Sequence, residues 1–146
     1  MPVDPPALLP TNEHPSLRWI GLTGAATALQ VACAATQAPG PILLVTSDAA
    51  TAARLEEELA FFCAGGVPVF GFPGYETLPY DQFSPHPDII SQRLRTMARL
   101  PALKRGIVIV DVQTALQRLP PRTFIDGHAL SLKAGEALDL EQFRLR

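Results

Sequence analysis

The chain has 146 residues, 47% of them hydrophobic and 18% charged, with a formal net charge of −2 at pH 7. This balance is typical of one globular domain and excludes a chain that is disordered throughout. It also gives no overall attraction to DNA or to anionic membranes, so a contact with nucleic acid would need a local basic surface.

The N-terminal residues 1–16 are rich in proline, which predicts a flexible or extended leader, with order beginning near Leu17. They lack the features of a signal sequence, and no apolar run is long enough to cross a membrane. We therefore expect a cytoplasmic protein with no membrane contact. Cys33 and Cys63 lie in apolar helical segments and are interpreted as core residues, because neither has the neighbouring ligands of a metal site.

Three short apolar runs have the length and composition of buried strands: Ile42–Ser47, Val67–Phe72 and Gly106–Val112. Runs that are apolar at every position are typical of strands buried on both faces of a parallel sheet. Helical patterns alternate with these runs, at Ala25–Gln37, after a cap at Ser47 or Asp48, after a cap at Asp88 and at Thr114–Leu119. The alternation predicts an α/β fold, a three-layer sandwich with a mainly parallel sheet.

The two middle helices each have a predicted buried face. In the first, Leu55, Leu59 and Phe62 form a stripe that ends before Gly65 and Gly66. In the second, the predicted buried residues are Ile90, Leu94, Met97 and Pro101, with Gln92, Arg95 and Arg99 roughly opposite.

The segment "WIGLTGAATALQVA" has the outline of a phosphate-binding loop, which requires a second glycine, a lysine and a metal-ligating hydroxyl after its first glycine. With Gly21 at the first position, Ala26 stands at the second glycine. Thr27 and Ala28 then stand at the lysine and hydroxyl positions. Gly24 and the helix N-terminus leave room for a weak anion site. We interpret the loop as a turn that joins a strand to a helix, and we expect no cofactor and no metal; an active nucleotide site is the alternative.

Two single residues have a structural and a chemical interpretation. Asp111 ends a strand without an adjacent second carboxylate, so we interpret it as a strand-end or helix-capping residue rather than a Mg²⁺ ligand. His86 lies between prolines with no ligand or nucleophile near it in the sequence, so we expect no metal or acid-base role.

The loop "GYETLPYDQFSPHPD" gathers aromatic and acidic residues and could form an active site or a platform for stacked bases. We favour a packed structural loop, because Pro79, Pro85 and Pro87 fix the backbone while Tyr80 and Phe83 pin it to the domain.

A basic set without intervening acidic residues follows, and it could contact phosphates or an acidic partner surface, although solvated helix faces also carry such charges. Its members are Arg93, Arg95, Arg99, Lys104 and Arg105.

The stretch "YETLPYDQFSPHPDIISQRLRTMARL" and the following "IVIVDVQTALQRLPPR" closely resemble the N-terminal region of bacterial transcription-repair coupling factors. The resemblance implies a degenerate phosphate-loop domain, similar to the helicase-like excinuclease B subunit, in which the "LTGAA" turn replaces an intact loop. It divides the chain into a leader at 1–16, the excinuclease B-like domain at 17–126, and a truncated start of the next module, the excinuclease A-interaction region, at 127–146. The DNA-inserting hairpin of the similar subunit is reduced here to Asp81–Ile90, which speaks against direct damage recognition.

The resemblance further implies a parent that is an ATP-dependent DNA translocase, which displaces stalled RNA polymerase and recruits excision repair. ATP and Mg²⁺ are then expected only in its motor domains, and the excinuclease A subunit and RNA polymerase bind beyond this chain. The chain itself is predicted to be no enzyme, but a scaffold in contact with the rest of the parent. The alternatives are a stand-alone nucleotide-binding protein with a divergent phosphate loop, and a weak duplex-DNA-binding module.

Overall fold

The computed structural model describes residues 9–77 and 82–128. Its centre is a three-stranded parallel sheet of β1 (Ile42–Thr46), β2 (Val69–Gly71) and β3 (Ile107–Asp111), in the order β1-β3-β2. Ile107 of the middle strand pairs with Ile42 on one side and with Val69 on the other. The predicted α/β class and the parallel sheet are confirmed.

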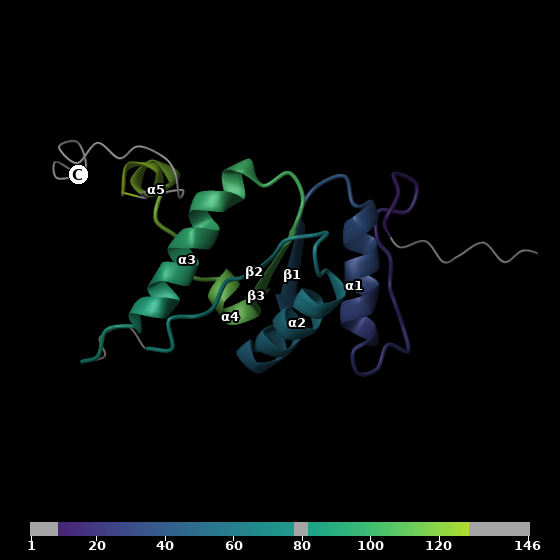
Figure 1. Cartoon of the computed structure of the whole chain (residues 1–146), viewed down its shortest axis with the longest axis horizontal. Coiled ribbons are helices and arrows are strands. Elements are labelled where there is room, and N and C mark those ends of the chain that lie inside the picture. The colour runs from purple at the N-terminus through teal and green to yellow at the C-terminus, as the bar shows by residue number, and fades with distance from the viewer. Residues whose placement is uncertain (1–8, 78–81, 129–146) are drawn as a thin grey trace, which may run out of the picture.

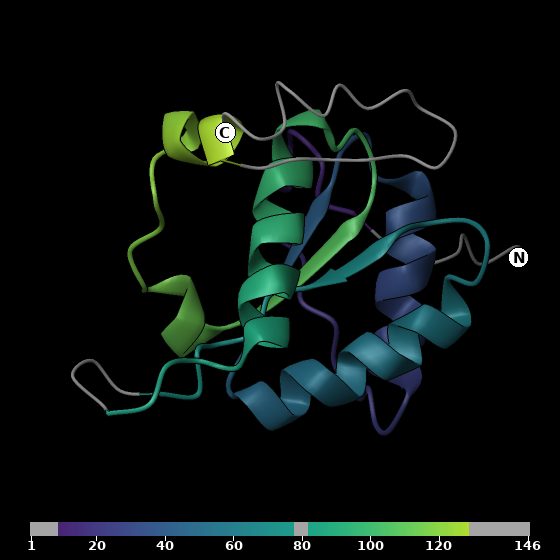
Figure 2. The ribbon, with the colours of Figure 1, turned by 60° about the vertical axis from the view of Figure 1, so that its left-hand side comes forward.

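Helices cover both faces of this sheet (Figures 1 and 2). The helices α1 (Ala26–Gln37) and α2 (Ala49–Phe62) lie on one face and α3 (Pro87–Arg99) lies on the other. Shorter elements are a 3-10 turn at Leu100–Ala102, α4 (Val112–Ala115) and α5 (Arg122–His128). Helix α5 packs against α3.

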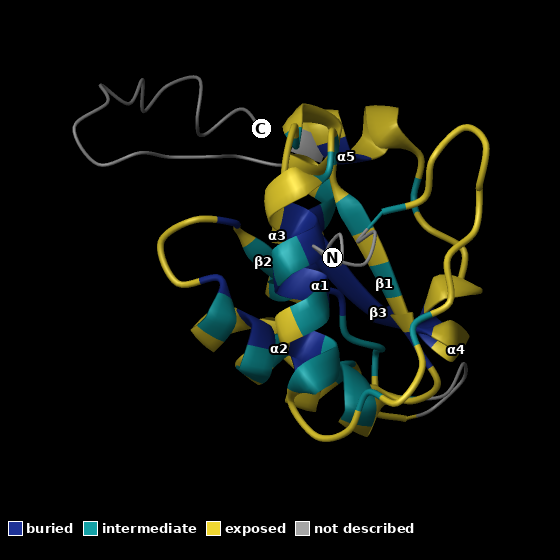
Figure 3. Ribbon diagram, turned by 90° about the vertical axis from the view of Figure 1, so that its right-hand side faces the viewer, coloured by how far each residue is buried: buried dark blue, intermediate teal, exposed yellow. Residues whose placement is uncertain are grey.

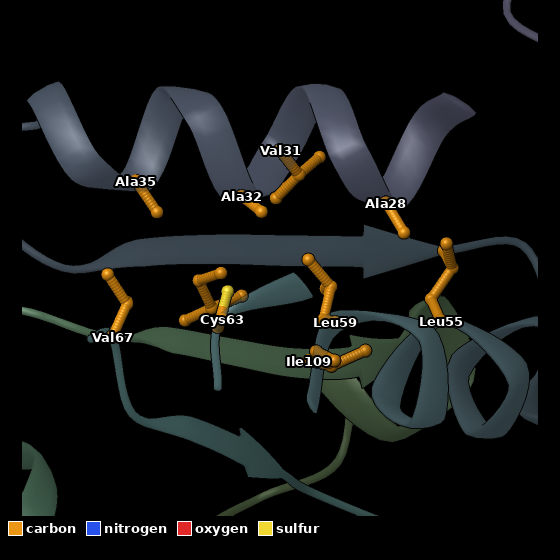
Figure 4. Close-up of a cluster of buried hydrophobic side chains, with 10 residues drawn as sticks. Ala28, Val31, Ala32, Ala35, Leu55, Leu59, Cys63, Val67 and Ile109 are labelled. Atoms are coloured by element: carbon orange, nitrogen blue, oxygen red, sulfur yellow. The ribbon is translucent and has the colours of Figure 1, made fainter. Parts of the chain in front are cut away.

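The core is divided by β3, because successive side chains of a strand point to opposite faces. Ile107 and Ile109 join a cluster with α1 and α2, while Val108 and Val110 pack with Phe72 toward α3. Figure 4 shows the first cluster, in which small residues such as Ala28 and Ala32 of α1 face larger residues such as Leu59 of α2. The predicted stripe is confirmed: Leu55 and Leu59 are buried and Phe62 packs against the cluster.

Strand β1 departs from the prediction that it is buried on both faces. Ile42 and Leu44 pack against the core, but Leu43 is 65% exposed and Val45 is 49% exposed. Figure 3 shows the contrast between the partly exposed β1 and the fully buried β3. The reason is position: β3 lies between two strands, whereas β1 is an edge strand whose α3-side face is left uncovered by the described residues.

The buried face of α3 was also predicted wrongly. Arg93 and Thr96 are buried, whereas Ile90 and Leu94 are exposed and Met97 alone of the predicted apolar residues on the helix packs against the core. The helix places a charged residue inward because that residue finds aromatic and carbonyl partners there, as described below. The prediction was wrong because a hydrophobic pattern assigns every arginine, here Arg93, to the exposed face of a helix.

Several boundaries differ from the predictions. Residues 17–22 form no strand, so the phosphate-loop-like turn follows an irregular segment. The cap at Asp48 is confirmed, with its carboxylate accepting from the Thr51 N–H at 2.7 Å. The helix predicted at Thr114–Leu119 is instead α4, which begins two residues earlier and is shorter.

The C-terminal part was only partly anticipated. Helix α5 was not predicted and it spans residue 126, where the first domain was predicted to end. Most of the predicted next module at 127–146 and the first half of the predicted leader lie outside the described residues.

Candidate functional site

The turn before α1 has the backbone of a tight loop. Gly21 and Gly24 have φ angles of 74° and 53°, a left-handed conformation that glycine adopts without strain. A side chain at either position would meet no neighbouring atom within 4 Å, so the requirement is for conformation and not for space. The Ala26 N–H donates to the Thr23 carbonyl at 3.1 Å, and Ala25 caps α1 without a side-chain hydrogen bond.

The residues at the phosphate-binding and metal-binding positions of the motif pack against the domain instead. Ala28, at the hydroxyl position, is fully buried in the core beside α2. Thr27, at the lysine position, lines a largely apolar cavity of about 810 Å³ together with Trp19 and Val31. Arg18 is the one cation among the described residues that line this cavity. The phosphate-loop motif does not include it, because Arg18 precedes the loop. In the described part of the chain no group of three or more His, Cys, Asp or Glu residues is arranged to hold a metal.

Asp111 is a helix cap, as predicted. Its carboxylate accepts from the Thr114 N–H at 3.0 Å and begins α4 directly at the end of β3. Burial alone would raise the pKa of Asp111, but hydrogen bonds from the hydroxyl and N–H of Thr114 and from the Gln113 N–H outweigh it and lower that pKa. Its oxygens are therefore engaged by the helix that follows.

The proline-rich loop is only partly pinned. Phe83 is 80% exposed, so the prediction that it anchors the loop is wrong, and Tyr80 and Pro79 lie outside the described residues. Tyr75 is the aromatic residue that does pack, against Arg93. The predicted cap at Asp88 is also wrong: the His86 ring caps α3, accepting from the Asp88 N–H at 3.3 Å.

Arg93 is the principal correction to the basic set. Its guanidinium carbon lies 4.2 Å from the centre of the Phe72 ring and 3.9 Å from that of Tyr75, and its Nη1 donates to the Pro73 carbonyl at 2.5 Å. The side chain is 1% exposed, so it cannot contact a phosphate or a partner surface. Its Nε and Nη2 are buried and have no hydrogen-bond partner among the described residues. Arg93 therefore fixes the loop after β2 to α3.

The other basic residues separate into two groups. Arg105 donates to the carbonyls of Ala35, at 3.2 Å, and Thr36, so it caps the C-terminal end of α1. Arg95, Arg99 and Lys104 are exposed, and the two arginines line a groove between α2 and α3. Of the five residues of the predicted basic set, these three remain available for an external contact.

Both cysteines are free thiols. Cys63 is buried in the cluster beside α1 and α2, as predicted, and Cys33 is half-buried. Burial raises the pKa of the Cys63 thiol, and the nearby Cys33 adds to that rise. Cys63 therefore remains a neutral packing residue.

No family model matches the chain. The fold and the turn before α1 define a class: a parallel α/β domain whose phosphate-loop-like turn lacks the residues that grip nucleotide and metal. Comparison with characterised proteins is more specific. The chain is 46% identical over 123 residues to the transcription-repair-coupling factor of Escherichia coli and 36% identical over 135 residues to that of Haemophilus influenzae. It is 27% identical over 123 residues to the factor of Staphylococcus aureus.

The chain is therefore homologous to one segment of the bacterial transcription-repair-coupling factors, as its sequence motifs predicted. The matches cover 84% and 92% of this chain but only 10% and 11% of the length of the first two relatives. Among the described residues, no helix is both long enough and apolar enough to span a membrane.

Proposed function

We propose that the chain is a non-catalytic module of a transcription-repair coupling factor, which serves as a scaffold and as a contact surface for the rest of that protein. The parent would be an ATP-dependent translocase that displaces stalled RNA polymerase and recruits excision repair in the cytoplasm. Excinuclease A and the polymerase would bind outside this chain, and ATP and Mg²⁺ would bind in its motor domains. The domain itself would be a degenerate relative of the excinuclease B helicase domain.

The uncovered face of β1 carries this proposal. Leu43 and Val45 expose apolar side chains there, and the exposed Val112 and Leu116 continue the surface onto α4 and the turn after it, with α4 in contact with β1. The same strand is an edge, and β-sheet edges with apolar side chains readily pair with other chains. Because the matched relatives are about ten times longer than their matched segment, the remainder of such a protein is the natural cover.

The first test is the mass of the native product, measured by immunoblot of source cells with an antibody against residues 75–100. The proposal predicts a band many times heavier than 15.7 kDa. A band at that mass alone would contradict it. In the heavy product, changing both Leu43 and Val45 to Glu should increase protease cleavage between this module and the rest, whereas Leu29→Glu, on an exposed position of α1, should not.

Nucleotide binding separates the proposal from its enzymatic alternative. The purified chain is expected to show no heat of binding with Mg-ATP, because Thr27 and Ala28 replace the lysine and the hydroxyl. Binding that is lost on Gly24→Asp would support a stand-alone nucleotide-binding protein instead. Salt-sensitive binding to duplex DNA would support the DNA-binding alternative.

A further inference from the structure

Strand β2 forms the other edge of the sheet, and only part of that edge is closed. The residues that flank β2 bond to β3: the Pro68 carbonyl accepts from the Ile107 N–H at 2.9 Å, and the Phe72 N–H donates to the Ile109 carbonyl at 2.8 Å. In a parallel ladder the alternate residues, Val69 and Gly71, direct their backbone groups away from β3. The Gly71 carbonyl accepts from the Thr96 hydroxyl at 3.2 Å, whereas among the described residues Val69 has no recorded partner for its outward groups.

A groove of about 410 Å³ runs along this edge, between α2 and α3. Val69 and Phe70 of β2 form its floor. Helix α2 contributes Glu56, which accepts a hydrogen bond from the Gly71 N–H. Helix α3 contributes Arg95 and Arg99. The groove therefore combines a strand edge that is open at Val69 with two cations, Arg95 and Arg99, and two carboxylates, Glu56 and Asp88.

The two arginines are available for a ligand. They are one helical turn apart and exposed, and neither forms an ion pair with a described residue. The Arg99 guanidinium lies 5.8 Å from the centre of the Phe70 ring, which keeps it over the floor of the groove. Planar guanidinium groups bind carboxylates through paired hydrogen bonds.

We propose that this groove binds an extended, acidic segment of a separate protein, which adds to the edge of β2 at Val69. Alternate side chains of such a segment would point to opposite sides of the sheet. Its carboxylates would face Arg95 and Arg99 on the α3 side, and its apolar side chains would lie near Val69 on the other side.

The charges of the groove favour a peptide over a nucleic acid. Glu56 lies in the wall and Asp88 also lines the groove, so a continuous phosphate backbone would meet two carboxylates as well as two cations. A peptide can place a carboxylate at the arginines and a neutral residue elsewhere. The partner is assigned to a separate protein because β2 and the uncovered β1 are opposite edges of the sheet, so the proposed cover of β1 leaves this groove accessible. The assignment to a separate protein rests on the proposed function, whereas the binding of an acidic segment in the groove does not.

The test is fluorescence polarisation with a short labelled peptide in which glutamate alternates with valine. A lysine-valine peptide of the same length and a peptide with all glutamates before all valines are the comparison probes. We expect the alternating acidic peptide to bind most tightly, and Arg95→Glu and Arg99→Glu each to weaken it about tenfold. Arg118→Glu, an exposed charge reversal outside the groove, is the matched control and should leave binding unchanged.

A second variant tests the strand edge itself. Val69→Pro removes an N–H that points away from β3, so the ladder should remain and the acidic peptide should bind about tenfold more weakly. Circular dichroism and urea unfolding verify that each variant is folded; Arg95→Glu and Arg99→Glu carry the test if Val69→Pro unfolds. No binding at millimolar peptide, equal binding of the lysine peptide, or equal loss in Arg118→Glu would overturn the proposal. Displacement of the peptide by a short DNA duplex would assign the groove to nucleic acid, and loss of the site in the longer native product would assign it to a segment of the same protein.

Discussion

The two edges of the sheet end in different ways. At β2, helices from both faces reach the edge: Glu56 of α2 accepts from the Gly71 N–H and Thr96 of α3 donates to the Gly71 carbonyl. At β1 no described helix covers the α3-side face, and Leu43 and Val45 are exposed. A strand edge whose backbone groups already bond to side chains offers few groups for pairing with another chain. An exposed apolar edge strand pairs with other chains more readily. The β2 edge is therefore closed at Gly71 and open at Val69, whereas the described residues leave the whole α3-side face of β1 uncovered.

The largest expected change in the free energy of unfolding is at a core residue, and it is compared with the same substitution on the exposed face of β1. Leu59 is fully buried, so Leu59→Ala should lower the free energy of unfolding by about 2–5 kcal/mol. Leu43→Ala removes the same atoms from a side chain that is 65% exposed and should cost less than about 1 kcal/mol. Urea unfolding followed by circular dichroism measures both. Equal costs would show that the β1 face is already covered in solution, for example by self-association.

Substitutions of Arg93 test how the loop after β2 is fixed to α3. Arg93→Ala removes the contacts with Phe72 and Tyr75 and the hydrogen bond to Pro73, and should cost about 2–3 kcal/mol in urea unfolding. Arg93→Met keeps much of the volume and removes two buried nitrogens that no described residue hydrogen-bonds, so it should cost about 1 kcal/mol or less. A loss for Arg93→Met as large as the loss for Arg93→Ala would show that the charge and its contacts, and not the volume of the side chain, stabilise the fold.

Gly71 tests the clamp at the β2 edge. A Cβ at this position would overlap the Glu56 carboxylate, the far end of a flexible side chain, so Gly71→Ala should cost less than about 1 kcal/mol by displacing that side chain. In the Glu56→Ala background the same change should be nearly neutral, and the difference is a coupling energy from a double-mutant cycle. Additive effects would mean that Gly71 is required by the backbone and not by Glu56.

The smallest effect depends on pH. Burial raises the pKa of the Glu56 carboxyl, the Gly71 N–H partly offsets the rise, and Glu57 adds to it. A carboxyl with a raised pKa binds its proton more tightly in the folded state, so ionised Glu56 lowers stability above that pKa. Glu56→Gln should therefore raise the unfolding midpoint slightly at pH 7 and leave it unchanged at a pH below the ordinary pKa of Glu. A gain of the same size at both pH values would contradict this assignment.

The sequence predicted the parts of the fold that depend on neighbouring residues. The apolar runs identified the three strands, and Asp48 and Asp111 were expected to cap helices because their carboxylates reach backbone N–H groups three residues on. Arg93 was misplaced because its stabilising partners are two aromatic rings brought in by another loop. The exposure of β1 was missed because apolar composition does not reveal whether a helix lies over a strand. The groove was missed because its two walls come from helices separated by β2 and a loop.

The order of the strands has a consequence for synthesis of the protein. The central strand β3 is the last of the three to leave the ribosome, so β1 and β2 have no partner until residues 107–111 emerge. The C-terminal end of helix α1 also lacks its cap until then, because Arg105 bonds to carbonyls about 70 residues earlier in the chain. Contacts between distant segments slow folding and leave apolar surface uncovered in the meantime. The nascent chain therefore holds two strands and three helices without their central strand until β3 arrives, which makes this strand the step that commits the domain to its fold.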